Sequence, residues 1–379
     1  MIVGGGPAGD AVAAGLRDAG FAGEILLIGS EPETPYERPH LSKGYLMGTV
    51  ARDRLPLRPA EQYRVLRVDL LLGETVVDLG LERRAVELES GRTLLWDVLC
   101  IATGSDARHL EGFAAPLYLR HLHQAEQLRT LIDSLAPFDI IGAGFIGCEV
   151  AAVAVQKGSE VRVHEAMRAP LVRVLGPELG DYLASVHRAH GVELRLNVDS
   201  LPQSDGAVLV AVGSVPRTGL AEKAGLDVDR GVVVDALGRT TAPGVFAAGD
   251  VTRFFSPLYE AQIRVEHFQT AQRHGFAVGR AMAGATGPYD EAPWFWSDQY
   301  DLNIQYTGAG LEWDAIVTRG RLGVPPFTVF YLSGGRLVAA AGVNDHHTVA
   351  RTRRLLEMRR SVSPQQLADP NFDLRRGLA

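Results

Sequence analysis

Two glycine-rich motifs of the form G-x-G-x-x-G constrain this chain of 379 residues more than any other feature. The first runs from Gly4 to Gly9 (GGGPAG) and the second from Gly142 to Gly147 (GAGFIG). Each follows a short apolar strand and precedes a run of small residues that is typical of a helix. Strand–turn–helix units of this kind build parallel sheets, so the sequence predicts an α/β fold.

The glycines also indicate what such turns bind. The first glycine of the motif permits a tight bend, the second lets the backbone approach a pyrophosphate, and the third lets the helix pack on the strand. The helix N-terminus adds N–H groups and a positive dipole end. An acidic residue about 20 positions further on holds the ribose hydroxyls, and Glu31 and Glu165 stand there. The alternative is a pair of tight turns without ligands, but the recurrence favours two bound dinucleotides.

The hydrophobic pattern predicts the elements around these turns. We expect strands at 1–3, 24–28, 138–141 and 161–164, an apolar strand within the glycine-bearing segment 244–250, a helix at 148–156, aromatic strands at 294–296, 327–332 and 337–342, a helix at 348–360, and then a polar tail. The sequence thus predicts two interleaved three-layer dinucleotide-binding (Rossmann-like) domains plus a C-terminal α+β domain. We place the first domain at 1–108 and 236–290, the second at 109–235 and the third at 291–379.

Composition excludes several classes of protein. With 45 acidic and 38 basic residues, a net charge of −7 and no long basic run, the sequence disfavours nucleic acid as the main partner. No stretch approaches 18 uncharged apolar residues, so we expect no membrane span. The sequence begins almost at once with the glycine-rich turn, so we expect no signal peptide.

The two cysteines fit a reducing compartment, and we predict a cytoplasmic protein. The histidines show no metal-ligand spacing, so we expect no metal.

Glu165 also predicts which nicotinamide cofactor is used. A carboxylate beside the adenosine ribose hydrogen-bonds a 2′-hydroxyl and repels a 2′-phosphate, which favours NADH over NADPH. Arg162 and Arg168 stand nearby, and an arginine there could instead pair with a phosphate. We interpret both arginines as surface side chains.

Further motifs resemble a known family. The two dinucleotide motifs, Ala102-Thr103-Gly104 and Gly249-Asp250 are similar to the glutathione-reductase-type FAD- and NAD(P)-dependent oxidoreductases. The strings at 35–43 (PYERPHLSK) and 293–299 (PWFWSDQ) resemble, more narrowly, the ferredoxin reductases of bacterial aromatic-ring dioxygenase and cytochrome P450 systems. The resemblance covers nearly the whole chain. It implies an FAD enzyme that takes hydride from NADH at the flavin and passes single electrons to a [2Fe–2S] ferredoxin.

The resemblance also implies site residues, with FAD at the first glycine turn and NADH at the second. The implied FAD contacts are Gly4, Gly6, Gly9, Glu31, Arg38, Lys43, Thr103, Gly104, Arg120, Gly249, Asp250, Glu266 and Trp296. The implied NADH contacts are Gly142, Gly144, Ile146, Gly147, Glu165 and Gly213. Lys43 and Glu149 would form an ion pair beside the flavin N5 and the nicotinamide, and we treat them as the catalytic candidates.

Each of these residues has a plainer alternative. Lys43 could be a solvated loop lysine, and Glu149 could simply complement the dipole of its helix. Asp250 could be a turn or cap residue. Trp294 and Trp296 share one face of a strand, where core packing is the usual role, and Trp294 is the rival of Trp296 for the place against the flavin.

The positions of the cysteines exclude several possible reactions. Disulfide reductases of this architecture carry a C-x-x-x-x-C pair just after the first βα unit, and residues 35–46 contain no cysteine. Reduction of glutathione, lipoamide or thioredoxin is therefore disfavoured, and so is a single redox cysteine. We interpret Cys100 and Cys148 as packing thiols. A second interpretation of Cys148 is a helix N-terminal thiol of lowered pKa.

Two segments depart from the family pattern. The stretch from Gly191 to Val215 is shorter than in the family, which indicates a trimmed NADH domain with Gly213 and Pro216 as its surviving landmarks. The string at 120–124 (RHLHQ) replaces the usual Arg-Thr and acidic residue, which weakens the case for Arg120 as an FAD contact.

The C-terminal segment is locally basic and suggests a partner. It carries Arg351, Arg353, Arg354, Arg359, Arg360, Arg375 and Arg376 against Glu357, Asp369 and Asp373. Such a surface could steer an acidic ferredoxin, and the alternative is a solvated helix and tail.

Rubredoxin, a quinone-like molecule or dioxygen stay open as acceptors. A redox-signalling flavoprotein of slow turnover, as among relatives of apoptosis-inducing factor, stays open as a different class. Nothing in the sequence selects an oligomeric state.

Overall fold

The computed structural model describes residues 1–202, 204 and 206–378, and its chain divides into two compact units. Unit 1 comprises residues 1–37, 55–106 and 215–293, and unit 2 comprises residues 38–54, 107–214 and 294–379. The chain crosses between the units five times, and two of these crossings fall within strands, in β8 (Ser105–Ala107) and β13 (Ser214–Pro216). Each unit contains one of the two glycine-rich turns. The division into three domains at 108, 235 and 290 stays a prediction.

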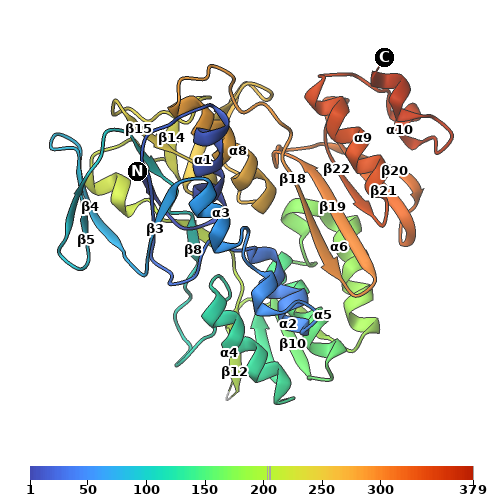
Figure 1. Cartoon of the computed structure of the whole chain (residues 1–379). Helices are drawn as coiled ribbons and strands as arrows, with labels where there is room; N and C mark the ends of the chain where they lie inside the picture. Colours follow the sequence, from blue (N-terminus) through green and yellow to red (C-terminus); the bar gives the residue numbers. More distant parts are fainter. Residues whose placement is uncertain (203, 205, 379) are drawn as a thin grey trace. The chain divides into compact units, whose positions relative to one another are not determined.

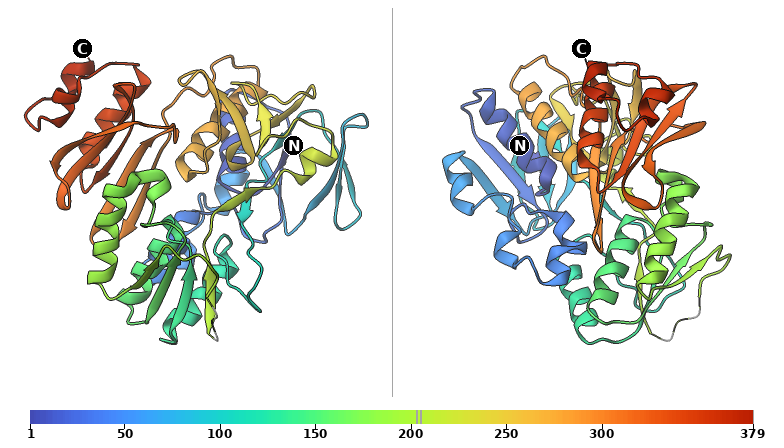
Figure 2. Two further views of the ribbon diagram at one scale, coloured as in Figure 1. Left: turned by 180° about the vertical axis from the view of Figure 1, so that it is seen from behind. Right: turned by 90° about the vertical axis from the view of Figure 1, so that its right-hand side faces the viewer.

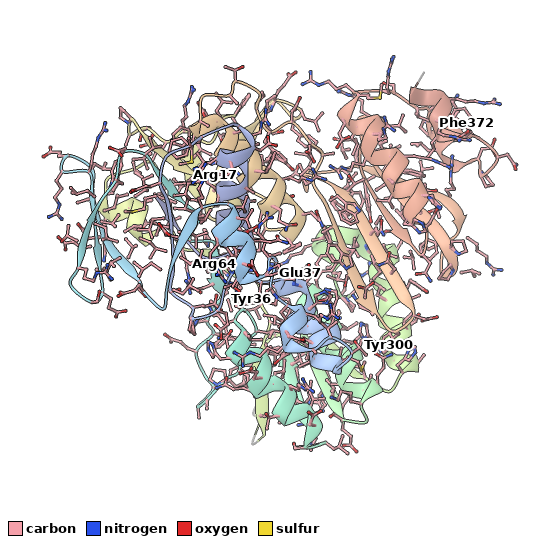
Figure 3. All side chains as sticks on the ribbon, viewed as in Figure 1. Arg17, Tyr36, Glu37, Arg64, Tyr300 and Phe372 are labelled. Carbon is pink, nitrogen blue, oxygen red and sulfur yellow. The ribbon has the colours of Figure 1, made fainter. Side chains whose placement is uncertain are left out.

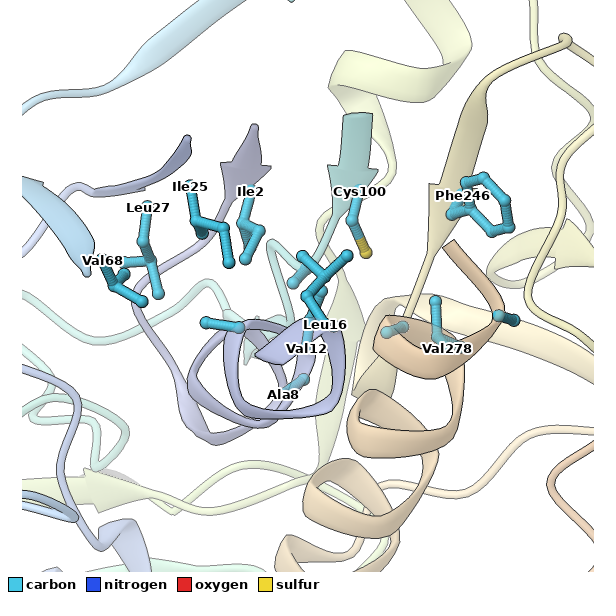
Figure 4. Close-up of a cluster of buried hydrophobic side chains, with 14 of the residues drawn as sticks. Ile2, Ala8, Val12, Leu16, Ile25, Leu27, Val68, Cys100, Phe246 and Val278 are labelled. Carbon is cyan, nitrogen blue, oxygen red and sulfur yellow. The ribbon is translucent and has the colours of Figure 1, made fainter. Parts of the chain in front are cut away.

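Unit 1 is built around a parallel sheet with the strand order β15-β7-β1-β2-β3. Its strands are β1 (Ile2–Val3), β2 (Ile25–Gly29), β3 (Val68–Leu72), β7 (Leu99–Ile101) and β15 (Val245–Ala247). Helices α1 (Pro7–Asp18) and α8 (Phe268–Met282) lie side by side against this sheet (Figure 4). They approach closely because a Cβ on Gly279 would lie 2.2 Å from the Val12 carbonyl oxygen. Ile2, Leu27 and Cys100 are fully buried in the core between sheet and helices.

Two smaller antiparallel or mixed sheets and several short helices complete unit 1. Sheet β4-β5-β6 consists of Val76–Gly80, Ala85–Leu88 and Thr93–Leu95, and sheet β14-β16-β17 of Val232–Val234, Thr252–Ser256 and Ala261–Ile263. The short helices are α3 (Ala60–Val65), α7 (Gly219–Lys223) and the 3₁₀ helix η3 (Gly249–Val251).

Unit 2 contains a second parallel sheet, with the order β11-β10-β9-β12. Its strands are β9 (Phe138–Ile141), β10 (Val161–Glu165), β11 (Glu193–Leu196) and β12 (Ala207–Val210). Its helices are η1 (Arg38–Ser42), α2 (Gly44–Met47), η2 (Arg52–Arg54), α4 (Leu122–Asp133), α5 (Phe145–Gln156) and α6 (Val172–Ala189). Helix α5 begins at Phe145, so the predicted start at Cys148 is wrong, because the helix starts directly after Gly144 of the turn.

The C-terminal part of unit 2 is an antiparallel sheet with the order β18-β19-β22-β21-β20 (Figures 1 and 2). Its strands are β18 (Trp294–Gln299), β19 (Leu302–Gly308), β20 (Ala315–Arg321), β21 (Val324–Ser333) and β22 (Arg336–Val343). Helices α9 (His346–Glu357), α10 (Pro364–Ala368) and η4 (Leu374–Leu378) follow. The predicted polar tail is therefore wrong: Leu367 and Leu374 are fully buried against the sheet and hold these short helices in place.

The two parallel sheets and the separate antiparallel sheet confirm the predicted fold class. Among the helices that the structure describes, none is long and apolar enough to cross a lipid bilayer.

Candidate functional site

The first glycine-rich turn lies between β1 and α1 of unit 1. Gly4 has a φ of +130°, and a Cβ there would lie 2.0 Å from the Ala102 carbonyl oxygen, so only glycine fits. A Cβ on Gly9 would lie 2.0 Å from the Gly4 carbonyl oxygen, which shows how closely the helix packs on the strand. At Gly6, in contrast, no protein atom lies within 4 Å of the Cβ position. The turn thus has an open face at the helix N-terminus, where a phosphate group fits.

Other predicted FAD contacts of unit 1 lie at the same edge of its sheet. Glu31 follows β2, Thr103 follows β7 and Asp250 follows β15. These strands are parallel to β1, so their carboxyl ends meet at one edge, beside the glycine turn. The structure therefore brings these predicted residues together, although they come from distant parts of the sequence.

Hydrogen bonds fix the polar groups of this edge. Tyr36 donates its hydroxyl to Glu31 Oε2 at 2.6 Å, and Ser105 donates to the buried Asp250 at 3.3 Å. Thr103 Oγ1 donates to the Arg217 carbonyl at 2.9 Å.

The backbone beside these groups has its own constraints. Gly104 has a φ of +70° and Gly249 a φ of +78°, so both turns use the left-handed region that favours glycine. Glu266 lies further along, between β17 and α8, and accepts a bond from Arg264 at 2.6 Å.

The second glycine-rich turn, between β9 and α5 of unit 2, repeats the first. Gly142 has a φ of +100°, and a Cβ on it would lie 2.6 Å from the Ala211 carbonyl oxygen. A Cβ on Gly147 would lie 2.1 Å from the Gly142 carbonyl oxygen. The Cβ position of Gly144 meets no atom closer than 3.9 Å. This turn also has an open face at its helix N-terminus, so the residues present fit a second dinucleotide.

Glu165 ends β10 and is held at this second turn. Its Oε2 accepts from the backbone N–H of Ala143 at 2.7 Å, and its Oε1 accepts from that of Met167 at 2.8 Å. The carboxylate is thus fixed beside the glycines, as a ribose ligand requires. Gly213 follows β12 with a φ of +106° and open space at its Cβ position, and Ile146 is 40% exposed in the first turn of α5.

The two arginines near Glu165 both have acidic partners. Arg162 forms a bidentate pair with the buried Asp139, with both N···O distances at 2.9 Å. Arg168 is exposed and pairs with Asp181 at 2.6 Å. Arg168 is therefore a surface side chain, as predicted, and Arg162 is held against β9.

Lys43 and Glu149, the predicted ion pair, come together within unit 2. The distance from Lys43 Nζ to Glu149 Oε2 is 2.8 Å, and the two side chains are only 14% and 4% exposed. Glu149 lies in α5, close to the second glycine turn, and Lys43 follows η1. Ser42 also donates to Glu149 Oε2, and Ser297 donates to Oε1 at 2.7 Å. The buried carboxylate of Glu149 thus has three donors around it: Lys43, Ser42 and Ser297.

Sequence reasoning assigned no role to Ser42 and Ser297. Both stand inside the strings at 35–43 and 293–299 that carry the family resemblance. A signal for Ser297 exists in the period of two along β18, which places it on the face opposite Trp294 and Trp296.

Three further predicted FAD contacts also belong to unit 2: Arg38, Arg120 and Trp296. Arg38 donates to the Arg120 carbonyl at 2.6 Å, so these two predicted FAD contacts are neighbours. Trp294 and Trp296 stack on each other with ring centroids 5.5 Å apart. Both side chains are half-buried, and the choice of Trp296 as the flavin neighbour stays a prediction.

Both cysteines are buried thiols that form no disulfide. Burial raises the pKa of Cys100 to about 12 and raises that of Cys148 as well, with Glu149 and Glu165 adding to the second effect. The interpretation of Cys148 as a thiol of lowered pKa is therefore wrong, because desolvation outweighs the helix N-terminus. The interpretation as packing thiols fits the buried positions of both.

Comparison with known proteins identifies the class. Residues 1–201 and 204–275 match the model of the pyridine nucleotide-disulphide oxidoreductase family, and residues 294–378 match the reductase C-terminal family. The chain belongs to the pyridine nucleotide-disulphide oxidoreductase family. It is an oxidoreductase of the type that uses FAD and NAD(H), and the two open glycine turns fit these dinucleotides.

Individual relatives narrow the resemblance. Rhodocoxin reductase of Rhodococcus erythropolis is 36% identical, with 100% of this chain and 94% of the relative covered. The ferredoxin–NAD(+) reductase component of the anthranilate 1,2-dioxygenase system of Burkholderia cepacia is 37% identical, with 99% and 98% covered. The putidaredoxin reductase in a covalent complex with putidaredoxin superimposes with a TM-score of 0.95 at 33% identity, covering 100% of this chain and 97% of that one.

The alignment lengths bear on the predicted shortening. The alignment with rhodocoxin reductase extends over 401 positions and this chain has 379 residues, so at least 401 − 379 = 22 positions have no counterpart here. Between β11 and β12, the described residues of 197–206 form no helix or strand. The trimmed NADH domain stays a prediction.

Proposed function

We propose that this chain is an NADH:ferredoxin oxidoreductase. It passes a hydride from NADH to FAD and then single electrons to a small iron–sulfur ferredoxin that supplies an oxygenase. The observation that carries the proposal is the buried Lys43–Glu149 pair beside the second glycine turn. The ferredoxin reductase names of relatives that align over nearly the whole chain support it.

The two glycine turns divide the binding of the two dinucleotides. We assign FAD to the turn of unit 1 and NADH to the turn of unit 2. The FAD contacts within unit 1 would be Gly4, Gly6, Gly9, Glu31, Thr103, Gly104, Gly249, Asp250 and Glu266. The family resemblance also assigns Arg38, Lys43, Arg120 and Trp296 to FAD, and that assignment stays a prediction. The NADH contacts would be Gly142, Gly144, Ile146, Gly147, Glu165 and Gly213.

Lys43 and Glu149 have separate tasks in this proposal. When bound, FAD supplies the chemistry that accepts a hydride and releases electrons singly. The Lys43 ammonium is a fixed cation that stabilises negative charge developing near it. Glu149 orients Lys43, and its burial keeps water away from the pair, which strengthens the electrostatic effect of the ammonium.

NADH is the preferred donor in this proposal. Glu165 presents a carboxylate where the adenosine ribose lies in this class of turn, and it repels a 2′-phosphate. The arginines that could attract that phosphate are bound to Asp139 and Asp181. Both observations favour a free 2′-hydroxyl.

The basic C-terminal segment is our candidate for ferredoxin docking. Arg354, Arg360 and Arg376 are exposed on α9, after it and on η4. Two arginines of the segment are neutralised locally, Arg353 by Glu357 at 2.9 Å and Arg375 by Asp373 at 2.7 Å. The exposed guanidinium groups supply positive charge that raises the rate of encounter with an acidic protein.

Charge reversal tests this docking surface. In Arg354→Glu with Arg360→Glu, the rate of ferredoxin reduction at low salt should fall about tenfold, and its salt dependence should flatten. NADH-dependent bleaching of the flavin band should not change. Arg92→Glu, an exposed arginine of unit 1, is the matched control. Equal losses in both variants would contradict a local docking surface.

A cytoplasmic location accompanies this function. Two buried thiols without a disulfide fit a reducing compartment, and NADH is the donor we assign. Fractionation of cells that express the natural protein, with immunodetection in each fraction, tests the location.

Anaerobic mixing tests the function as a whole. The purified yellow protein is mixed with NADH, and an oxidised [2Fe–2S] ferredoxin is then added while the flavin and iron–sulfur absorbances are followed. Fast bleaching followed by many turnovers of ferredoxin is the expected result. Bleaching without onward transfer would contradict ferredoxin as the acceptor and would favour another acceptor or a redox-signalling flavoprotein. No bleaching would contradict the NADH assignment.

A further inference from the structure

A row of polar side chains extends from Glu149 through unit 2 to the turn between β18 and β19, and all of them are buried except the half-buried Tyr300. Ser297 Oγ lies 2.7 Å from Glu149 Oε1, and Gln299 Nε2 lies 3.1 Å from Ser297 Oγ. Gln299 Oε1 lies 3.0 Å from His187 Nε2, and Tyr300 Oη lies 2.9 Å from His187 Nδ1. The side chains thus form one unbroken sequence of hydrogen bonds.

The ion pair with Lys43 sets the direction of every bond in this row. As the partner of Lys43, Glu149 is a carboxylate and only accepts, so Ser297 donates to it. The Ser297 oxygen then accepts from the amide nitrogen of Gln299, which turns the Gln299 carbonyl toward His187. Since a carbonyl only accepts, His187 donates from Nε2 and its Nδ1 accepts from the Tyr300 hydroxyl. All donors therefore point toward Glu149.

This arrangement requires one form of His187, the neutral ring with its proton on Nε2. Burial lowers the pKa of His187 to about 4, which keeps the ring neutral at physiological pH. Any other form of the ring would disrupt the row of hydrogen bonds. With a protonated ring, Tyr300 would lose its acceptor, and with the other tautomer the Gln299 amide would have to turn.

Two elements place these groups. Ser297 and Gln299 alternate along β18 and therefore point to the same side of the strand, where both are at most 1% exposed. His187 lies near the C-terminal end of α6 and is 2% exposed. Tyr300 stands in the turn after β18 (Figure 3), and its ring stacks on His190 with centroids 3.7 Å apart. A buried polar row is stable only when each member is satisfied, and this one is.

We propose that Gln299 and His187 are positioning residues for the Lys43–Glu149 pair. By keeping Ser297 on Glu149 Oε1, they leave Oε2 for Lys43 and Ser42 and fix the place of the Lys43 ammonium. The inference rests on the proposed function, because its effect on the reaction acts through this pair.

The tautomer of His187 is the first test, and it needs no turnover. In protein labelled with ¹⁵N-histidine, the ring signals of His187, assigned by their loss in His187→Phe, report which nitrogen carries the proton. A proton on Nε2 is the expected result, both without and with FAD. A proton on Nδ1, or a charged ring at pH 7, would overturn the inference.

Substitutions test the effect on the reaction. Gln299→Glu keeps the shape but places an acceptor where Ser297 needs a donor, and His187→Phe removes the donor to Gln299. In both, the rate constant of NADH-dependent flavin bleaching at saturating NADH should fall about tenfold. The dissociation constant of NADH should stay unchanged, because Glu165 and the glycine turn are untouched. His187→Gln, whose amide can donate to Gln299, should restore most of the rate.

His190→Phe is the matched control on the same helix end, since His190 stacks on Tyr300 but stands outside the row. If His187 has only a structural role, His187→Phe should lower the melting temperature and leave the rate constant at saturating NADH at its wild-type value. That result would overturn the inference and leave the proposed function intact. If the wild-type protein is not reduced by NADH at all, the proposed function fails, and the role in the reaction fails with it. A lowered rate in Gln299→Glu with a wild-type melting temperature would support the inference most directly.

Discussion

The turn after β1 and the turn after β9 have similar backbone geometry, yet the helices that they start carry different buried carboxylates. In α1, Asp10 accepts from Arg58 Nε and from the Tyr63 hydroxyl, both at 2.8 Å. Burial and the neighbouring Asp10 raise the pKa of Tyr63, so this hydroxyl stays a donor. In α5, Glu149 instead faces Lys43 and two serines.

One residue of offset accounts for this difference. Asp10 directly follows the third glycine of its turn, whereas Glu149 is the second residue after Gly147. A shift of one residue turns a side chain by about 100° around a helix, so the two carboxylates face different neighbours. The shared turn therefore explains the shared ability to bind a dinucleotide. The position of one acidic side chain decides which helix also carries the Lys43–Glu149 pair, to which we assign the catalytic role.

Removing the two carboxylate charges should have the largest effects, and these effects should differ between α1 and α5. Glu149→Gln keeps the shape but removes the charge that orients Lys43, and the rate constant of flavin bleaching by NADH should fall about 10²-fold. Asp10→Asn should leave that rate unchanged and lower the free energy of unfolding by about 3 kcal/mol, because Arg58 loses its buried partner. Anaerobic stopped-flow measurements and urea unfolding measure the two effects. Equal rates in both variants would contradict the assignment of the two carboxylates.

Alanine at the central glycine of each turn should weaken the binding of one ligand only, FAD at Gly6 and NADH at Gly144. Gly6 and Gly144 have open Cβ positions and negative φ, so alanine fits the protein at both without strain. The added methyl group would occupy the space of the bound pyrophosphate, so we expect at least a roughly tenfold loss of affinity. Gly6→Ala should lose FAD on dialysis, while Gly144→Ala should keep FAD and bind NADH more weakly in a titration. Loss of the same ligand in both variants would contradict the division.

Glu165 should set the choice between NADH and NADPH. In Glu165→Ala, the ratio of kcat/KM for NADH over NADPH should fall about tenfold, because the repulsion of a 2′-phosphate is lost. Arg168→Ala is the control, since Arg168 is bound to Asp181, and its ratio should stay at the wild-type value. A weaker use of NADPH in Arg168→Ala would instead assign the phosphate to that arginine.

The smallest expected effect is on the pH dependence of the free energy of unfolding, through one buried histidine in each unit. Burial lowers the pKa of His274 in unit 1 to about 3 and that of His187 in unit 2 to about 4. Below pH 6.5 the unfolded chain therefore binds more protons than the folded one, and stability falls as the pH drops from 6.5 toward these values. Each histidine should contribute a slope of about 1.4 kcal/mol per pH unit at most.

Urea unfolding at pH 6.5 and at pH 5.5 measures this slope. His274→Gln should reduce the loss by about 1 kcal/mol over that interval. His347→Gln, at an exposed position on α9, should leave it unchanged. An unaltered slope in His274→Gln would show that His274 is not buried in its neutral form.

The sequence predicted the parts of this fold that depend on local pattern. The glycine turns, the strand at 138–141 and the fold class follow from residues that are neighbours in the chain. The pairing of Lys43 with Glu149 was implied by family resemblance alone, because more than a hundred residues separate them. No local pattern contains that contact.

The row behind Glu149 shows why other contacts could not be predicted. Ser297 and Gln299 share one face of a strand, which a period of two does indicate. Their partner His187 lies on a helix far away in the sequence, and the register between helix and strand is set by tertiary packing. The C-terminal helices were missed for a related reason. Leu367 and Leu374 stand alone in a polar stretch, and only the sheet beside them makes them core residues.

The division of the chain also has a consequence for how the protein is made. Unit 1 needs residues up to 293 and unit 2 needs residues from 38 to the C-terminal segment, so neither unit is a continuous stretch. A ribosome adds about 5–20 residues per second, so the segment with Lys43 waits many seconds for the strand that carries Ser297. During the first part of that time the parallel sheet of unit 1 still lacks β15, and throughout it unit 2 lacks its antiparallel sheet, which begins with β18. Slower translation or a shortage of chaperones should therefore lower the yield of this protein before any step of its chemistry is affected.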